Sequence, residues 1–156
     1  MSIKNQKLVI RDLRDLKVVI KGAGEMATGI AHRLFMARLR SIVMTEIAQP
    51  ITVRRTVAFS ESVYAGDMEV EGVKAELVKT IDELFGTWKK NRIGIIVDPE
   101  WNIVDALKPN VVVDAIMAKK NMGTRKDEAR LVIGVGPGFE APNNVHAVIE
   151  SNRGHN

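Results

Sequence analysis

Residues 18–29 read Val-Val-Ile-Lys-Gly-Ala-Gly-Glu-Met-Ala-Thr-Gly, a β-branched run followed by two glycines one residue apart and then by helical spacing. This order predicts a strand, a tight turn and a helix. Gly22 can adopt backbone angles that are closed to other residues, and Gly24 lets the chain approach a phosphate group with no side chain between them. Ala27 stands where a third small residue lets such a helix pack close to its strand. We therefore predict that a phosphate group binds at the helix N-terminus, which favours anions; the alternative is a tight turn with a purely structural role.

The residues after this turn complete a strand, helix, strand unit. The helix carries two apolar rows with a spacing of four, and we expect both rows to form one stripe against the sheet. The rows are Met26, Ile30 and Leu34, and Ala27, Ala31 and Phe35. A second strand over 41–46 ends at Glu46, at the distance from the glycines where nucleotide-binding folds place an acid on the ribose hydroxyls. We therefore assign Glu46 to a ribose; the alternative is an ion pair with Arg54 or Arg55.

The rest of the chain repeats this pattern of apolar strands and amphipathic helices. The predicted elements are helical spacing in 52–64, a hairpin in 67–78 that turns at Glu71-Gly72, a helix from Thr80 to Asn91, a strand at 93–97, a short helix at 102–107, a strand at 111–113 that ends at Asp114, a polar and basic loop at 117–130, and strands at 131–135 and 145–149. Residues up to Asp15 fit a short helix or an edge strand and stay unassigned. The strands are continuous apolar runs, as expected of parallel strands that are covered on both faces. The sequence therefore predicts one α/β domain of residues 1–156, Rossmann-like and doubly wound, with a mostly parallel sheet and a small β-hairpin insertion.

The composition sets limits on the class of protein. The chain has 156 residues, of which 46% are hydrophobic and 27% charged, as in ordinary globular domains. It has no cysteine, which excludes disulfides and thiolate metal sites and fits a cytoplasmic protein. The net charge is +4 but only 4% of residues are aromatic, so we expect a nucleotide-like anionic small molecule as the partner rather than a nucleic acid. No apolar run approaches the length of a membrane span, so we expect no membrane partner.

The candidate binding residues share one location, the carboxyl ends of the predicted strands, where open parallel sheets bind their ligands. They are Gly22, Ala23, Gly24, Glu25, Met26, Glu46, Arg54, Arg55, Asp98, Asp114, Lys119, Lys120, Gly136 and Gly138. The first glycines and the helix start would hold a diphosphate, and the arginines and lysines of this set would hold the remaining anionic groups. For the two arginines, a solvated surface pair is the alternative. Part of the clustering is automatic, because turns collect glycine and polar residues.

Metal binding and catalysis receive less support from the sequence. Glu46, Asp98 and Asp114 are ligands of the kind that hard cations favour, but acids at strand ends often cap the following helix, and we predict no metal. The histidines lack the spacing of a zinc site. Tyr64 is the one tyrosine of the chain and Met68 follows it four residues later, so the Tyr-x-x-x-Lys pair of one class of reductases is missing. The sequence therefore favours binding over catalysis and assigns no catalytic residue.

Several longer stretches carry a resemblance to a known family. They are Lys21–Gly29 (KGAGEMATG), Met44–Pro50 (MTEIAQP), Arg54–Glu61 (RRTVAFSE), Val113–Asn121 (VDAIMAKKN), Gly134–Phe139 (GVGPGF) and Glu150–Asn156 (ESNRGHN). In these stretches the chain resembles the selenium-dependent molybdenum hydroxylase accessory proteins, which are related to the Rossmann portion of xanthine dehydrogenase accessory factors. The resemblance extends over nearly the whole chain from about Asp15.

The resemblance implies a nucleotide-binding, Rossmann-like fold and a role in the maturation or insertion of a molybdenum cofactor, with a molybdenum hydroxylase as client. Together with the glycine turn, it makes NAD or a pterin dinucleotide the expected cofactor. An NAD-dependent oxidoreductase and a ligand-free interaction domain stay open as alternatives, as does a homo-oligomer. Proteins of this family usually continue past the segment that corresponds to 154–156, so we expect either a truncated chain or a C-terminal region that is encoded separately. The absence of cysteine argues against direct sulfur transfer by this chain.

Overall fold

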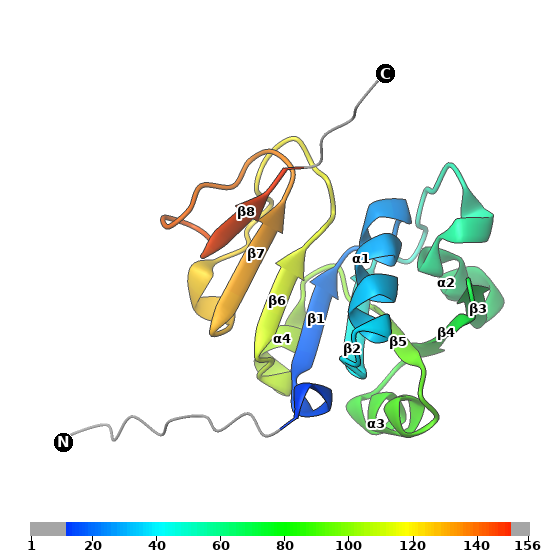
Figure 1. The fold of residues 1–156 in the computed structure, drawn as a ribbon. Coiled ribbons are helices and arrows are strands. Elements are labelled where there is room, and N and C mark those ends of the chain that lie inside the picture. Colours follow the sequence, from blue (N-terminus) through cyan, green and yellow to red (C-terminus); the bar gives the residue numbers. More distant parts are fainter. Residues whose placement is uncertain (1–11, 151–156) are drawn as a thin grey trace.

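The computed structural model describes residues 12–150 and has an α/β fold built on one eight-stranded sheet (Figure 1). The strands are β1 (Lys17–Lys21), β2 (Ser41–Glu46), β3 (Asp67–Val70), β4 (Val73–Val78), β5 (Ile93–Val97), β6 (Val111–Asp114), β7 (Leu131–Val135) and β8 (Ala147–Ile149). The helices are α1 (Glu25–Met36), α2 (Ser62–Ala65), α3 (Ile81–Lys89) and α4 (Asn102–Leu107), with 3₁₀ turns η1 (Leu13–Asp15), η2 (Arg55–Val57), η3 (Phe59–Glu61) and η4 (Lys126–Glu128). Most of the unassigned N-terminal stretch lies outside the described residues.

The order of the strands confirms the predicted Rossmann-like, mostly parallel sheet. The order is β3-β4-β5-β2-β1-β6-β7-β8, and among these described strands β3 and β4 form the one antiparallel pair. The central strand β1 is in register with β2 on one side and β6 on the other, so that Val19 lies between Val43 and Val112. The chain leaves β1 toward β2 and later crosses back to β6. The strand order therefore reverses between β1 and β6, which is where open α/β sheets bind ligands at the carboxyl ends of their strands.

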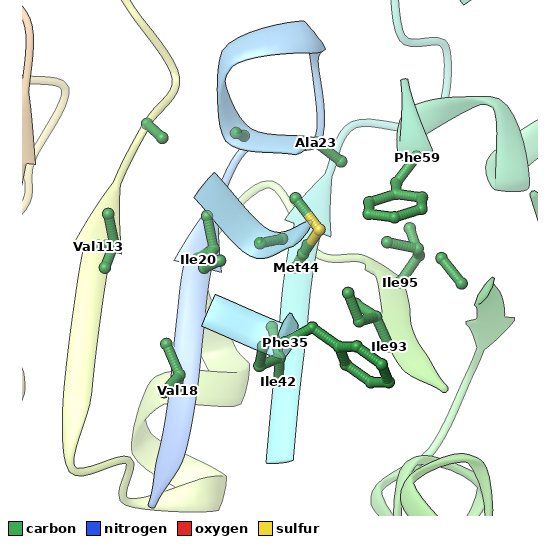
Figure 2. Packing of buried hydrophobic residues seen from close by; sticks show 14 of the residues in the cluster. Val18, Ile20, Ala23, Phe35, Ile42, Met44, Phe59, Ile93, Ile95 and Val113 are labelled. Atoms are coloured by element: carbon green, nitrogen blue, oxygen red, sulfur yellow. The ribbon is translucent and has the colours of Figure 1, made fainter. Parts of the chain in front are cut away.

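Both faces of the sheet are covered, as a doubly wound fold requires. On one face, Val18 and Ile20 pack under α1 together with Phe35 and Phe59 (Figure 2). On the other face, Val19 packs in a second cluster that includes Leu84 of α3 and further residues of α4. Because successive side chains of a strand point to opposite faces, a continuous apolar strand such as β1 supplies both cores.

The hairpin and the cap of α3 are confirmed. Strands β3 and β4 pair antiparallel and turn at Glu71 and Gly72, both of which have positive φ (+46° and +81°), as a tight two-residue hairpin turn requires. Strand β4 also pairs with β5, so the hairpin extends the edge of the main sheet. The Thr80 hydroxyl accepts a hydrogen bond from the backbone N–H of Glu83 (3.1 Å) and thereby caps α3.

One prediction of local structure is wrong, and a second holds only in part. The helical spacing in 52–64 gives only η2, η3 and the four-residue α2, in keeping with the many β-branched residues that follow Pro50. In α1, Ala27, Ala31 and Phe35 are buried against the sheet, whereas Met26 at the start of the other row is 39% exposed. Ile30 and Leu34 of that row are partly buried and pack against the same core, so the predicted stripe holds except at Met26. Within residues 12–150, no helix combines the length and the apolar character that a membrane span needs.

Candidate nucleotide-binding site

The two glycines after β1 have different roles. Gly22 has a φ of +95°, and a Cβ atom there would lie 3.2 Å from the carbonyl oxygen of Ala115, so this glycine lets the end of β1 pass close to the end of β6. Gly24 precedes α1, and a Cβ atom there would meet no atom within 4 Å. Gly22 therefore serves the packing of the chain, and Gly24 faces open space.

The turn between these glycines is hydrogen-bonded to other parts of the chain. The backbone N–H of Gly22 donates to the carbonyl of Thr45 (3.0 Å), and the carbonyl of Ala23 accepts from the backbone N–H of Ser60 (2.9 Å) and the hydroxyl of Thr28 (3.2 Å). Ala23 is fully buried and takes no part in lining the cavity. These bonds fix the backbone of the turn before any ligand arrives, which lowers the ordering cost of binding.

The N-terminus of α1 opens onto a cavity of about 1310 Å³. Gly24 is the N-cap and offers no side-chain hydrogen bond, so the first N–H groups of this 12-residue helix keep the capacity to bind an anion. The cavity is lined by residues from the turn and α1, from the end of β2 and the loop behind it, and from the ends of β5 and β6. They include Gly22, Gly24, Glu25, Met26, Glu46, Arg54 and Asp98 among the predicted residues, and Ile30, Leu34, Ile47, Ile51, Val53, Trp101, Ile116, Met117 and Met122 among the others.

Glu46 lies directly beside the turn. One carboxylate oxygen accepts a hydrogen bond from the backbone N–H of Ala23 (3.0 Å), and the other accepts from the backbone N–H of Ile47 (2.8 Å). Each carboxylate oxygen has a second lone pair, so both can accept from a hydroxyl group in the cavity as well. The structure does not show the alternative ion pair between Glu46 and an arginine, because Arg54 and Arg55 have other partners.

The two arginines form separate ion pairs. Arg54 donates from Nε and Nη2 to Glu25 (3.0 and 2.8 Å), and its backbone N–H donates to the same carboxylate (2.9 Å). These bonds hold the pKa of Glu25 below its usual range. Arg55 donates to Glu61 (2.8 and 2.7 Å), and its guanidinium lies 5.4 Å from the ring centroid of Tyr64. Arg54 lines the cavity and Arg55 does not.

The acids that end β5 and β6 bond to their own chain. Asp98 accepts from the backbone N–H of Ile103 (2.8 Å) and the amide of Asn102 (3.0 Å) and so caps α4, which was the alternative to metal binding. Asp114, which is 2% exposed, accepts from the hydroxyl of Thr124 (2.6 Å) and the backbone N–H of Ile116 (3.2 Å). Among residues 12–150, no group of three or more His, Cys, Asp and Glu side chains is placed to hold a metal ion.

Besides Ala23, Arg55 and Asp114, four more of the predicted binding residues do not line the cavity. A Cβ atom at Gly138 would lie 2.6 Å from the Cα atom of Lys120, and one at Gly136 would lie 3.2 Å from the side chain of Met117. These two glycines therefore allow the turn after β7 to pack against residues 117–121. Lys119 and Lys120 are exposed, and neither they nor the glycines line the cavity.

Sequence reasoning missed a buried cation at the end of β1. The Lys21 side chain is fully buried, and Nζ donates to the hydroxyl of Thr124 (2.7 Å) and to the carboxylate of Glu128 (2.7 Å). Nζ also lies 3.7 Å from the centroid of the Trp101 ring. Burial lowers the pKa of Lys21, and Glu128 opposes that shift. The signal was a lysine directly after three apolar residues of a strand predicted to be buried, since a buried charge needs a partner.

The fold and this arrangement define a class: a Rossmann-like α/β protein with an open glycine turn and a neighbouring acid at the point where the strand order reverses. Among curated proteins, the chain is similar to "Uncharacterized protein YqeB" of Escherichia coli (strain K12), with 48% identity over 138 residues. These residues are 88% of this chain and 25% of that protein, so the chain spans about a quarter of its relative's length. No protein-family model and no solved structure matches the chain.

Proposed function

We propose that this chain binds a ligand with a diphosphate group, NAD or a pterin dinucleotide, at the N-terminus of α1. The observation that carries the proposal is the open space in front of Gly24, at a helix N-terminus with no side-chain cap, on the wall of a cavity large enough for a dinucleotide. A phosphate at this position would accept hydrogen bonds from backbone N–H groups. It would also lie at the positive end of the helix dipole.

Glu46 supports a ligand with a ribose beside the diphosphate. Its carboxylate is bonded to the glycine turn, so a sugar attached to a phosphate at that turn would lie within reach of the acid. A carboxylate in this position accepts from ribose hydroxyls and repels a phosphate on the same ribose. The proposal therefore favours NAD over NADP among nicotinamide dinucleotides.

For the biological role, we propose that the chain serves the maturation or insertion of the molybdenum cofactor of a hydroxylase. The support is the resemblance of the glycine-turn stretch, the stretch around Glu46 and the stretch from Arg54 to the selenium-dependent molybdenum hydroxylase accessory proteins. In this role the chain would carry or sense a dinucleotide form of the cofactor and pass it to a client hydroxylase. An NAD-dependent oxidoreductase is the second candidate, because the acid beside the turn suits NAD equally well.

Mass spectrometry of small molecules released from the purified protein on denaturation tests the proposal directly. It is complemented by thermal unfolding with NAD, NADP and pterin dinucleotides, since a ligand at a hundred times its Kd adds about 2.7 kcal/mol of stability. A dinucleotide in the released fraction, or a melting shift of several degrees, is the expected result. A change in NADH absorbance with time would indicate catalytic turnover and favour the oxidoreductase. If neither experiment finds a ligand, the proposed binding is refuted.

Gly24→Val gives a variant that separates binding from folding. The backbone angles of Gly24 (φ −70°, ψ −170°) are open to all residues and its Cβ would meet no atom, so the fold should persist. The new side chain would occupy the space proposed for the diphosphate, and binding should be lost. Gly86→Ala in α3, where a Cβ atom also meets nothing, is the matched control and should bind as the wild type does.

A further inference from the structure

The ion pair between Glu25 and Arg54 lines the same cavity as Gly24, beside the helix N-terminus where the proposed diphosphate would bind. Glu25 is the first residue of α1, so its carboxylate lies at the positive end of the helix. Both residues line the cavity, and their three hydrogen bonds are 2.8–3.0 Å long. An anion that reaches the first backbone N–H groups of α1 would be repelled by the carboxylate of Glu25 and attracted by the guanidinium of Arg54, which now neutralises that carboxylate.

This ion pair can be exchanged at low cost. The side chains of Arg54 and Glu25 are 72% and 31% exposed, and exposed pairs contribute little to stability. A phosphate offers a guanidinium the same two-pronged geometry as a carboxylate, with more negative charge. Arg54 can therefore move from Glu25 to a bound phosphate without the loss of a buried contact.

The loop that carries Arg54 has features that would let it move together with the Arg54 side chain. Residues 47–54 form neither helix nor strand, and Ile47 and residues 50–54 line the cavity. Within this loop Ile51 is 97% exposed and Val53 is 93% exposed. The backbone of the loop is held at two points: the Tyr64 hydroxyl donates to the carbonyl of Pro50 (2.9 Å), and the hydroxyls of Thr52 and Ser60 share a hydrogen bond (2.8 Å). When such exposed apolar side chains close over a ligand, their surface is removed from water, and this burial stabilises the closed conformation.

We propose that Arg54 binds the ligand's diphosphate by exchanging the carboxylate of Glu25 for phosphate oxygens, and that the exposed side chains of Ile51 and Val53 close over the ligand as it does so. This inference rests on the function proposed above and assigns the anion-binding role to one of the two neighbouring arginines. Arg55 keeps its pair with Glu61, whose side chain is 21% exposed, and stays outside the cavity.

Binding of NAD and of inorganic pyrophosphate to matched variants tests the exchange. Arg54→Ala should weaken the binding of both probes about 10- to 100-fold, the range for lost hydrogen bonds to a charged group. Arg55→Ala, the control on the next residue, should change Kd less than threefold. Glu25→Gln should tighten pyrophosphate binding several-fold, because the competing charge is gone, whereas Glu61→Gln should leave it unchanged. Thermal unfolding of each variant verifies that it is folded.

Limited cleavage by trypsin reports the closure of the loop. In the Arg55→Ala variant, cleavage after Arg54 should slow when NAD is present.

Failure of the proposed function and failure of the exchange can be told apart. If the wild type binds none of the dinucleotides or pyrophosphate, the proposed function fails and the exchange falls with it. If the wild type binds but Arg54→Ala and Arg55→Ala lose affinity equally, or Glu25→Gln weakens binding, only the exchange is refuted.

Discussion

The carboxylate of Glu46 lies 3.0 Å from the backbone nitrogen of Ala23, so the end of β2 is hydrogen-bonded to the turn that follows β1. Because Ala23 is fully buried, removal of this carboxylate leaves a buried N–H group without its acceptor. We expect Glu46→Ala to lower the free energy of unfolding by about 1–3 kcal/mol. Glu46→Gln should cost less, since its amide oxygen can still accept the bond. Urea unfolding measures both, with the exposed Glu100→Ala as control, and equal losses in the two Glu46 variants would contradict the role of the bond.

Glu46 also predicts a preference between nicotinamide dinucleotides. A phosphate on the adenosine ribose of NADP would lie near the carboxylate, so the wild type should bind NAD more tightly. We expect Glu46→Gln to narrow the ratio of the two dissociation constants about tenfold, which corresponds to about 1.4 kcal/mol of removed charge repulsion. Calorimetric titration with each dinucleotide provides the ratio. Equal affinity of the wild type for NAD and NADP would show that Glu46 does not face the ribose.

Gly22 should tolerate no side chain, in contrast to Gly24. Its φ of +95° strains any other residue, and a Cβ atom would lie within 3.2–3.3 Å of the backbone of Ala115 and Ile116. We expect Gly22→Ala to lower the free energy of unfolding by at least about 1–2 kcal/mol, and Gly24→Ala to change it much less. Thermal unfolding of the two variants makes the comparison, and similar melting temperatures would mean that β1 and β6 can move apart at this point.

The sequence predicted those parts of the fold that depend on local pattern. The apolar run before Gly22, the Glu71-Gly72 turn and the Thr80 cap are each specified by neighbours within a few residues, and the structure has each of them. Glu46 could be placed near the glycine turn because parallel strands end at the same edge of the sheet. That shared edge follows from a general rule for open parallel sheets.

Contacts between distant loops could not be predicted in this way. Lys21 bonds to Thr124 and Glu128, more than a hundred residues away, and no local pattern says which loop residue reaches a given strand end. The same limit applies to Gly138, whose lack of a side chain serves the backbone at Lys120. Two adjacent arginines looked equivalent in the sequence, yet only Arg54 lines the cavity.

Glu76 predicts a measurable effect of pH on stability. It accepts hydrogen bonds from Lys90 (2.6 and 2.9 Å) and Arg92 (2.8 Å), and these cations hold its pKa below the ordinary value of 4.5. A carboxyl group with a lowered folded-state pKa contributes its full stability above about pH 4.5, and the contribution is lost as pH falls through the lowered value. We expect Glu76→Gln to cost about 1 kcal/mol at pH 7 and much less at pH 3.

Urea unfolding of the wild type and Glu76→Gln across this pH range tests the prediction. Glu69→Gln is the control on the same hairpin, because its partner Lys74 is 3.7 Å away and both side chains are more than half exposed. The control should show little effect at either pH. A constant difference between the wild type and Glu76→Gln from pH 7 to pH 3 would exclude the carboxylate charge as its cause.

The buried pair of Lys21 and Glu128 fastens the loop after β6 to the end of β1. The side chain of Lys21 is fully buried and that of Glu128 is 7% exposed, so each charge depends on the other. Lys21→Met leaves the Glu128 carboxylate uncompensated, and we expect it to lower the free energy of unfolding by about 3–5 kcal/mol. The double variant Lys21→Met/Glu128→Gln should recover part of this loss, since it removes both charges.

The exposed Lys126→Met, on the same 3₁₀ turn as Glu128, is the control, and its free energy of unfolding should stay within about 0.5 kcal/mol of the wild type. Urea unfolding of the four proteins and of Glu128→Gln alone completes a double-mutant cycle. Additive losses in that cycle would mean that the two side chains do not depend on each other, and the loop would then be held by Thr124 and Asp114 instead.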